Sequence, residues 1–218
     1  MMEMDLEKLK KVQIELAKRV ELRPFESEVR FVVGLDVSYS RKLNKMVAAA
    51  VVLSYPSMRV VEYSWSVRDV EFPYVPTFLS FRELPAIEEA FTKLKHKIDL
   101  VLVDGQGIAH PRGLGIAAHF GVEMMVPTIG CAKSHLFGKW TMPTPKRGEW
   151  TPIIENGQVI GGVVRTRDNV KPIFVSPGNL IDVENAVKWA LKLSIGYRLP
   201  EPIRLADKIS RRIVNEGI

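Results

Sequence analysis

The sequence predicts an α/β fold in which helices flank a mixed central sheet. Three observations lead to this prediction: three strand-like apolar segments follow one another near the N-terminus, strand-like and helix-like segments then alternate, and two helix-like segments close the chain. A length of 218 residues suits a single domain spanning 1–218 and is sufficient to bury a substantial core.

The first part of the chain is predicted to form a helix followed by a meander of strands. Apolar residues recur at helical spacing from Asp5 to about Leu22, which indicates a packing helix. Strands are then predicted at Arg30–Tyr39, Met46–Leu53 and Val60–Val67. Because the turns between them are too short for parallel crossovers, these three strands should be antiparallel.

The remaining elements follow from the same two periodicities and from proline and glycine breaks. They are a loop at Glu71–Phe81, a helix at Arg82–Lys97, a strand at Leu100–Asp104, a short helix at Gly115–Phe120, a strand around Met125–Ile129, a basic loop at Lys139–Pro152, strands at Gln158–Arg165 and Pro172–Val175, and helices at Val183–Leu193 and Ile203–Ile213. This is the element order of a ribonuclease H-like sandwich.

Composition narrows the class of protein. The chain is 46% hydrophobic, yet its longest apolar runs fall well short of the roughly 20 residues that span a bilayer, so no membrane association is expected. The single Cys131 cannot form an internal disulfide, and with only four histidines it argues against structural zinc; a reducing cytoplasm is the expected compartment. A net charge of +6 favours an anionic partner such as nucleic acid.

Two aspartates are the first candidates for chemistry. Asp36 interrupts the apolar run Phe31–Val37, and Asp104 ends a predicted strand just before the glycine-rich segment Gly105–Arg112. A carboxylate inside a central strand is costly unless it is paired or holds a cation. If their strands are neighbours, both carboxylates meet at one sheet edge and suit a hard cation such as Mg²⁺. The alternatives are a salt bridge for Asp36 and a turn cap for Asp104.

Four further residues are candidates, each with a simpler alternative. Glu83 and Asp207 are possible additional ligands, or else a helix-dipole contact and part of a solvated helix face. Lys133 would offset charge on a phosphate, or else is a surface lysine. His110 would contact a metal-bound water or the phosphate, or else is a hydrogen-bonded structural histidine.

Tyr74 lies in the segment Pro73-Tyr74-Val75-Pro76, where the prolines restrict the backbone. A stiff loop can present an aromatic ring as a stacking surface or as a wedge at a base step. The alternative is that Tyr74 and Phe78 fold back into the core.

Together these segments resemble the endonuclease V family of DNA-repair nucleases. The matching blocks are Gly34-Leu-Asp-Val-Ser38, Phe72-Pro-Tyr-Val-Pro-Thr-Phe-Leu-Ser-Phe-Arg-Glu83, Val103-Asp-Gly-Gln-Gly-Ile-Ala-His-Pro-Arg112, Val126-Pro-Thr-Ile-Gly-Cys-Ala-Lys-Ser134 and Tyr197-Arg-Leu-Pro-Glu-Pro-Ile-Arg-Leu-Ala-Asp207. They span nearly the whole chain in the family's order.

The resemblance implies an endonuclease that recognises deoxyinosine in DNA and, with Mg²⁺ or Mn²⁺, cuts the second phosphodiester bond on its 3′ side. The products would carry a 3′-hydroxyl and a 5′-phosphate. It further implies metal-binding catalytic carboxylates at Asp36, Glu83 and Asp104, a further acidic position near the metal at Asp207, and catalytic assistance from His110 and Lys133. The implied strand-separating wedge is Pro73, Tyr74, Val75 and Pro76, and the implied base pocket is formed by Gly105, Gly107, Gly115, Ile116 and Ala132, largely through backbone groups.

Two positions depart from the family pattern. Cys131 stands where valine is expected, which is a small apolar change, and Asn179 stands where the family has histidine, which removes an imidazole. Two rival functions are weighed: an endoribonuclease that acts on inosine in RNA with the same active site, and a non-catalytic nucleic-acid-binding domain. Clustered carboxylates beside a phosphate backbone are unfavourable without a cation, which argues against the second rival. A monomer is expected.

Overall fold

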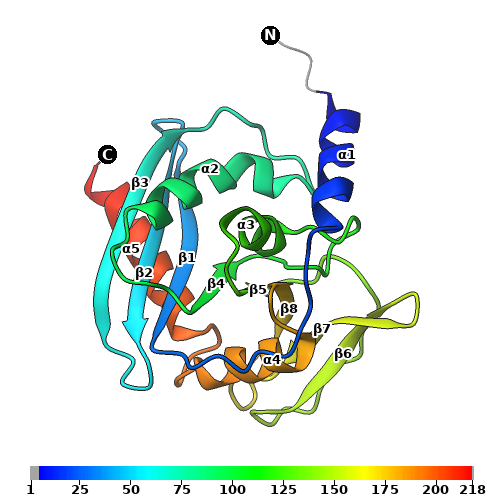
Figure 1. The fold of residues 1–218 in the computed structure, drawn as a ribbon. Helices are drawn as coiled ribbons and strands as arrows, with labels where there is room; N and C mark the ends of the chain where they lie inside the picture. Colours follow the sequence, from blue (N-terminus) through cyan, green and yellow to red (C-terminus); the bar gives the residue numbers. More distant parts are fainter. Residues whose placement is uncertain (1–4, 218) are drawn as a thin grey trace.

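The computed structural model describes residues 5–217, in which helices cover both faces of an eight-stranded mixed sheet (Figure 1). The elements are α1 (Leu6–Ala17), β1 (Phe31–Ser40), β2 (Lys45–Ser54), β3 (Val60–Asp69), α2 (Leu79–Thr92), β4 (Leu100–Asp104), α3 (Ile116–Met124), β5 (Thr128–Ala132), β6 (Trp150–Glu155), β7 (Gln158–Val164), β8 (Ile173–Asn179), α4 (Val183–Lys192) and α5 (Glu201–Glu216). The predicted fold class is confirmed. Across these described residues, no helix is both long and apolar enough to cross a membrane.

The strand order places the two candidate aspartates on neighbouring strands. The order is β3-β2-β1-β4-β5-β8-β7-β6. The β1–β2 and β2–β3 pairs are antiparallel, as predicted, whereas β1–β4 and β4–β5 are parallel. Because Leu35 of β1 is in register with Val103 of β4, the next residue on each strand is one of the aspartates.

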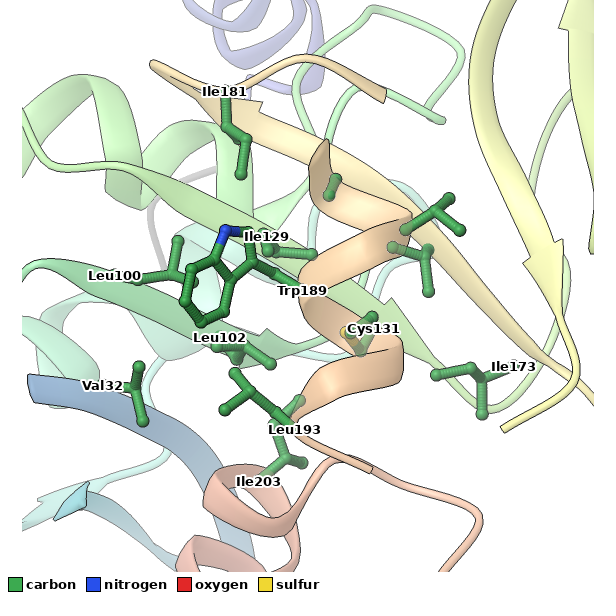
Figure 2. Packing of buried hydrophobic residues seen from close by; sticks show 14 of the residues in the cluster. Val32, Leu100, Leu102, Ile129, Cys131, Ile173, Ile181, Trp189, Leu193 and Ile203 are labelled. Carbon is green, nitrogen blue, oxygen red and sulfur yellow. The ribbon is translucent and has the colours of Figure 1, made fainter. Parts of the chain in front are cut away.

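Alternation along the strands divides the core into two layers. On β1, Val32 packs in the cluster beneath α4 and α5, whereas Val33 and Leu35 pack in the cluster beneath α2 and α3. Figure 2 shows the first cluster, to which Val32 of β1 and Ile203 of α5 both belong. Asp36 follows the same alternation as Val32, so its side chain belongs to the face covered by α5.

The backbone of β1 lies unusually close to the start of α5. A Cβ atom added at Gly34 would lie 2.1 Å from both the carbonyl carbon and the carbonyl oxygen of Pro202. Glycine is therefore required at this position for α5 to pack against the strand.

Strand β6 was not predicted. Most of the segment expected as a basic loop, Lys139–Pro152, is irregular, but its last three residues begin β6, which pairs antiparallel with β7. This strand contains Pro152 and forms the outer edge of the sheet, where a missing N–H is tolerated. β8 likewise extends beyond the predicted Val175, to Asn179.

Helix ends also differ from the predictions for physical reasons. α2 begins at Leu79 rather than Arg82 and ends at Thr92 rather than Lys97. Beyond its end, the carboxylate of Glu62 accepts the backbone N–H groups of Lys95 and His96, at 2.9 and 3.1 Å. α3 continues to Met124, where Met125 caps it in the left-handed conformation, so β5 begins at Thr128 and not at Met125.

The N-terminal helix is shorter and packs differently than predicted. It ends at Ala17, and Val12, one of the apolar residues at helical spacing that predicted the packing helix, is 37% exposed. The buried residue of α1 is instead polar: the side chain of Gln13 is fully buried.

Candidate active site

Asp36 and Asp104 lie side by side at the carboxyl edge of β1 and β4. Adjacent strands are roughly 4.8 Å apart, and both side chains belong to the α5 face of the sheet. Asp36 is only 6% exposed. Burial, followed by the nearby charge of Asp104, raises the pKa of Asp36 well above its ordinary value. The predicted meeting of these two carboxylates at one edge is confirmed.

Lys133 completes this arrangement from the end of β5. Its Nζ donates to Oδ2 of Asp104 at 2.7 Å. Burial lowers the pKa of Lys133, but attraction to Asp104 outweighs this effect and leaves the pKa above its ordinary value. The backbone of Lys133 is also held, because Nη2 of Arg198 donates to its carbonyl oxygen at 2.7 Å.

Two serines support Asp36 from the same face. The hydroxyl of Ser210, on α5, donates to Oδ2 of Asp36 at 2.9 Å. The hydroxyl of Ser38 lies 2.7 Å from that of Ser210. The hydrogen bond from Ser210 fixes the orientation of the Asp36 carboxylate. It also stabilises the ionised form of this carboxylate, which burial and the charge of Asp104 disfavour.

Glu83 reaches the site from the opposite face of the sheet. It lies on α2, is 7% exposed, and accepts a hydrogen bond of 2.5 Å from the hydroxyl of Tyr39 at Oε1. Burial raises the pKa of Glu83 to about 7; the Tyr39 hydrogen bond opposes this shift, and the charge of Asp104 adds to it. Tyr39 is in turn held by Arg82, whose Nε donates to the tyrosine oxygen at 3.0 Å.

Asp207 lies at the rim of the same cleft. A cleft of about 470 Å³ is lined by Asp36, Asp104, Lys133 and Asp207 among others. The Oδ1 atom of Asp207 is 2.8 Å from Nε of Arg211, one turn further along α5. Its charge still contributes to the raised pKa of Asp36, which places Asp207 close to the carboxylate pair.

A second cavity, of about 310 Å³, opens beside the carboxylates. Asp104 and Lys133 line this cavity as well as the cleft. Of the predicted pocket residues and wedge, the cavity is lined by Tyr74, Gly105, Gly115, Ile116 and Ala132. Its volume is at the lower end of the roughly 300–1,000 Å³ typical of ligand pockets.

Gly107 has a different place from the other predicted pocket residues. It does not line the cavity; its N–H donates to the hydroxyl of Ser176 at 2.8 Å. A Cβ atom at this position would lie 2.1 Å from the carbonyl oxygen of Pro177, so glycine permits the loop to cross β8.

Tyr74 projects from the loop before α2 and is 69% exposed. The alternative in which Tyr74 and Phe78 both pack into the core is therefore wrong for Tyr74, although Phe78 is buried. Pro73, Val75 and Pro76 flank the ring and do not line the cavity.

His110 lines the cavity, but both ring nitrogens are engaged within the protein. Nε2 lies 3.0 Å from the carbonyl oxygen of Thr77, and Nδ1 accepts from the backbone N–H of Arg112 at 3.2 Å. Burial lowers the pKa of His110 to about 4, so the ring is neutral at pH 7. The geometry matches the alternative of a hydrogen-bonded structural histidine.

The donor chemistry of the cleft fits a hard divalent cation. Asp36 and Asp104 offer oxygen atoms in the cleft, and Glu83 offers its own from the other face of the sheet. Burial first and the charge of Asp104 second raise the pKa values of Asp36 and Glu83, and a cation would relieve both effects by favouring the ionised carboxylates. Within residues 5–217, however, no three or more His, Cys, Asp or Glu side chains are already grouped as a cation site. A cation would have to compete with Lys133 for Asp104.

The two departures from the family pattern lie in structural positions. Cys131 is completely buried in the core. Asn179 is in register with Thr128 at the start of β5, whereas Asp104 is in register with Cys131, three residues further along the same strand. Asn179 is therefore roughly 10 Å along the strand direction from the position of Asp104. Its side chain accepts from the N–H of Glu21 and donates to the carbonyl of Gly121, both at 2.9 Å.

Sequence reasoning missed the supporting residues Tyr39, Ser210 and Arg198. Tyr39 lies one residue before the end of the strand that carries Asp36, but its position on the opposite face gave no signal of a contact with Glu83. Ser210 lies one helical turn after Asp207, and this spacing was the one available indication that it faces the same cleft.

The fold and the relatives of this chain define its class: a ribonuclease H-like nuclease that hydrolyses phosphodiester bonds. The family model described as Endonuclease V matches residues 14–208. The chain therefore belongs to the endonuclease V family. Nucleases of this family are metal-dependent.

Individual relatives agree along nearly their whole length. Endonuclease V of Rippkaea orientalis is 47% identical over 205 residues, covering 94% of this chain and 90% of the relative. The crystal structure of Endonuclease V from Streptomyces avermitilis has a TM-score of 0.90 and 39% identity, covering 96% of this chain and 93% of that one. Ciona intestinalis Endonuclease V, solved with a 24mer DNA containing an inosine followed by a ribo-adenosine, has a TM-score of 0.84 and 31% identity, covering 97% and 98%.

Proposed function

We propose that this protein repairs DNA by cutting the second phosphodiester bond on the 3′ side of deoxyinosine, the product of adenine deamination, with Mg²⁺ as its cofactor. The observation that carries the proposal is that Asp104 and Lys133 line both the carboxylate cleft and the neighbouring cavity. A base turned into the cavity would therefore bring the adjoining backbone to the carboxylates. The Ciona relative bound to inosine-containing DNA supports the same substrate.

The cavity suits a flipped purine read mainly by main-chain groups. Gly105 and Gly115 leave backbone atoms accessible, and Ile116 and Ala132 supply apolar walls. A Cβ at Gly115 would lie 2.3 Å from the carbonyl oxygen of Gln106, so this wall depends on glycine. Such a pocket reads the edge of a base by hydrogen bonds and encloses its faces by apolar contact.

The carboxylates are the proposed metal ligands, with Asp36, Asp104 and Glu83 supplying oxygen atoms and Asp207 supporting them from the rim. When bound, Mg²⁺, or Mn²⁺ in its place, activates water and offsets charge on the phosphoryl oxygens. Lys133 would release Asp104 and donate to the phosphate or to the leaving oxygen. Water adds to the phosphorus, the bond to the 3′ oxygen breaks and that oxygen takes up a proton, so the products carry a 3′-hydroxyl and a 5′-phosphate. For His110 we propose support of the cavity wall, because its ring nitrogens are already bonded.

We also propose that 1–218 acts as one monomeric nuclease domain in the cytoplasm. Strands from both ends of the described chain join one sheet, which supports a single domain; Met1–Met4 and Ile218 lie outside the described residues. A buried thiol at the single Cys131 suits a reducing compartment. Light scattering of the purified protein checks the oligomeric state.

The proposal is tested with a labelled duplex carrying one deoxyinosine. Cutting should require Mg²⁺ or Mn²⁺, should fall at the second phosphodiester 3′ to the lesion, and should be absent from the same duplex with adenine. An RNA strand with inosine at the same position distinguishes the endoribonuclease alternative. Binding of both substrates without cutting of either in the presence of metal would identify a non-catalytic binding domain instead.

A further inference from the structure

The carbonyl oxygen of Thr77 receives hydrogen bonds from three side chains that come from distant parts of the chain. The donors are Nε2 of Gln13 at 3.0 Å, Nε2 of His110 at 3.0 Å and Nη2 of Arg112 at 2.8 Å. They belong to α1 and to the loop between β4 and α3, whereas Thr77 lies just before α2. We call these four residues the Thr77 latch.

The latch is closed by further contacts among its members. The same Nη2 atom of Arg112 donates to the hydroxyl of Thr77 at 2.6 Å, and Nε of Arg112 donates to Oε1 of Gln13 at 2.5 Å. The guanidinium also lies over the ring of Phe78, 4.6 Å from its centre. Each polar atom of the Gln13 amide group is thereby used.

Two features show that the latch holds a conformation the chain would not otherwise keep. Thr77 has a φ of +70°, which is unfavourable for a β-branched residue and persists only where surrounding contacts impose it. Gln13 is the one buried residue of α1 (Leu6–Ala17), and a buried amide must find hydrogen-bond partners. The helix thus docks on the protein through the latch.

We propose that Gln13 and Arg112 are positioning residues that set the place of Tyr74 relative to the base cavity. Thr77 follows Tyr74 by three residues, and the turn between them is closed by the N–H of Phe78, which donates to the carbonyl of Val75 at 3.0 Å. Tyr74, Thr77 and His110 all line the cavity. Since the Tyr74 ring is largely exposed, its own packing does not fix it. The loop that carries it is held on one side by Nη1 of Arg82, which donates to the carbonyl of Phe72 at 2.9 Å, and on the other side by the latch.

This inference rests on the proposed function, because it assigns the latch to recognition of inosine in a duplex. It predicts that the latch affects the opening of the duplex more than the hydrolysis step. Single-stranded inosine substrate needs less unstacking and therefore depends less on where Tyr74 is held.

The test compares Gln13→Ala and Gln13→Glu with Lys11→Ala, an exposed residue on the same helix, as the matched control. Dissociation constants are measured in Ca²⁺ for an inosine duplex and for the same inosine strand alone. Gln13→Ala removes the hydrogen bonds to both Thr77 and Arg112 and should weaken duplex binding roughly 3- to 10-fold, with less than about 2-fold change on the single strand. Gln13→Glu keeps an acceptor for Arg112 but loses the donor to Thr77, so it should behave like Gln13→Ala.

A double-mutant cycle then asks whether Gln13 acts through Tyr74. In a Tyr74→Ala background, Gln13→Ala should cost less than about 2-fold in duplex binding, because the ring it positions is gone. Equal losses on duplex and single strand, or full additivity with Tyr74→Ala, would overturn the inference and leave the latch as a purely structural contact. Thermal unfolding of each variant shows whether lost binding merely follows lost folded protein, which would also overturn it.

The failure of this inference is distinguishable from failure of the proposed function. If the wild-type protein does not cut the inosine duplex, the proposed function is wrong. If it cuts normally and both Gln13 variants bind like Lys11→Ala, only the role of the latch is wrong.

Discussion

Nζ of Lys133 and Oδ2 of Asp104 lie 2.7 Å apart, so the protein supplies its own counter-ion to a carboxylate proposed to bind metal. Lys133→Ala should lower turnover by about 100-fold or more, the scale for losing a group that stabilises transition-state charge. The metal concentration that gives half-maximal rate should not rise, because Lys133 competes with the cation and is not a ligand. A large rise in that concentration with an unchanged maximal rate would contradict this role.

Asp36 and Asp104 should both be required for cutting. Replacing either residue by Ala should abolish cleavage while binding of inosine DNA survives or tightens, because a negative charge beside the phosphate backbone is removed. Single-turnover cleavage in Mg²⁺ and binding in Ca²⁺ measure the two effects separately. Activity of Asp104→Ala within a few-fold of wild type would rule out the proposed metal site.

The metal-free protein should be more stable with Asp36→Asn than with the native residue. Burial and Asp104 raise the folded-state pKa of Asp36 above its unfolded value of 3.8, so the folded state binds more protons and stability falls as pH rises above about 4. Asn removes this penalty, and the gain at pH 8 should be on the order of 2 kcal/mol and smaller at pH 5.

Bound Mg²⁺ should reduce the difference in unfolding free energy between Asp36→Asn and the wild-type protein. Mg²⁺ binds the folded state, and at ten times its dissociation constant it should add about 1.4 kcal/mol to wild type and less to Asp36→Asn. Thermal unfolding at both pH values, with EDTA and with Mg²⁺, checks both statements. A stability gain from Asp36→Asn that does not depend on pH would show that titration of Asp36 is not its cause.

Tyr39→Phe should impair catalysis without unfolding the protein. It removes the hydroxyl that donates to Glu83 and keeps the ring on which Arg82 lies, 4.6 Å from its centre. Loss of a hydrogen bond that orients a metal ligand typically costs 10- to 100-fold in metal affinity or activity, and we expect about 10-fold. The rate of cleavage is measured against metal concentration for Tyr39→Phe and for the control Tyr63→Phe, which changes an exposed tyrosine on β3. Equal curves for the two variants would show that the Tyr39 hydroxyl has no role in the site.

Tyr74→Ala should weaken binding to an inosine duplex by roughly 1–3 kcal/mol, the range for loss of a base–aromatic stack. The loss should be smaller on single-stranded inosine DNA, because there is less stacking to break. Dissociation constants in Ca²⁺ for the two substrates test this. Equal losses on both would make Tyr74 an ordinary contact and not a wedge.

The aspartate pair could be predicted from sequence because each residue breaks or ends an apolar strand whose partners follow from element order. Asp36 and Asp104 are charged residues at positions where the apolar strand pattern predicts burial, and neighbouring parallel strands can bring two such residues together. Glu83 and Asp207 lie on helices, where an acidic residue is ordinary, so their approach to the site depends on helix placement that periodicity does not give.

The burial of Gln13 and the existence of β6 could not be predicted, because their local sequence gives no sign of either. Gln13 looks like a surface residue of an amphipathic helix, and only its contacts with Thr77 and Arg112 show that it is the docking residue of α1. β6 was missed because Trp150 and Pro152 give no alternating pattern, and the strand is stabilised mainly by pairing with β7. The local sequence pattern cannot predict an element whose stability comes from contacts with other parts of the chain, such as a distant residue or a neighbouring strand.

Because β1 and α5 approach closely at Gly34, the position of Asp36, two residues away, relative to α5 depends on this glycine. Any side chain there would displace the Pro202 backbone, and with it the helix that carries Ser210 to Asp36. A homologous chain that keeps every carboxylate but has lost this glycine is thus expected to be a degenerate copy whose site no longer assembles. Position 34 can serve as a marker when active members of the family are separated from decayed ones by sequence alone.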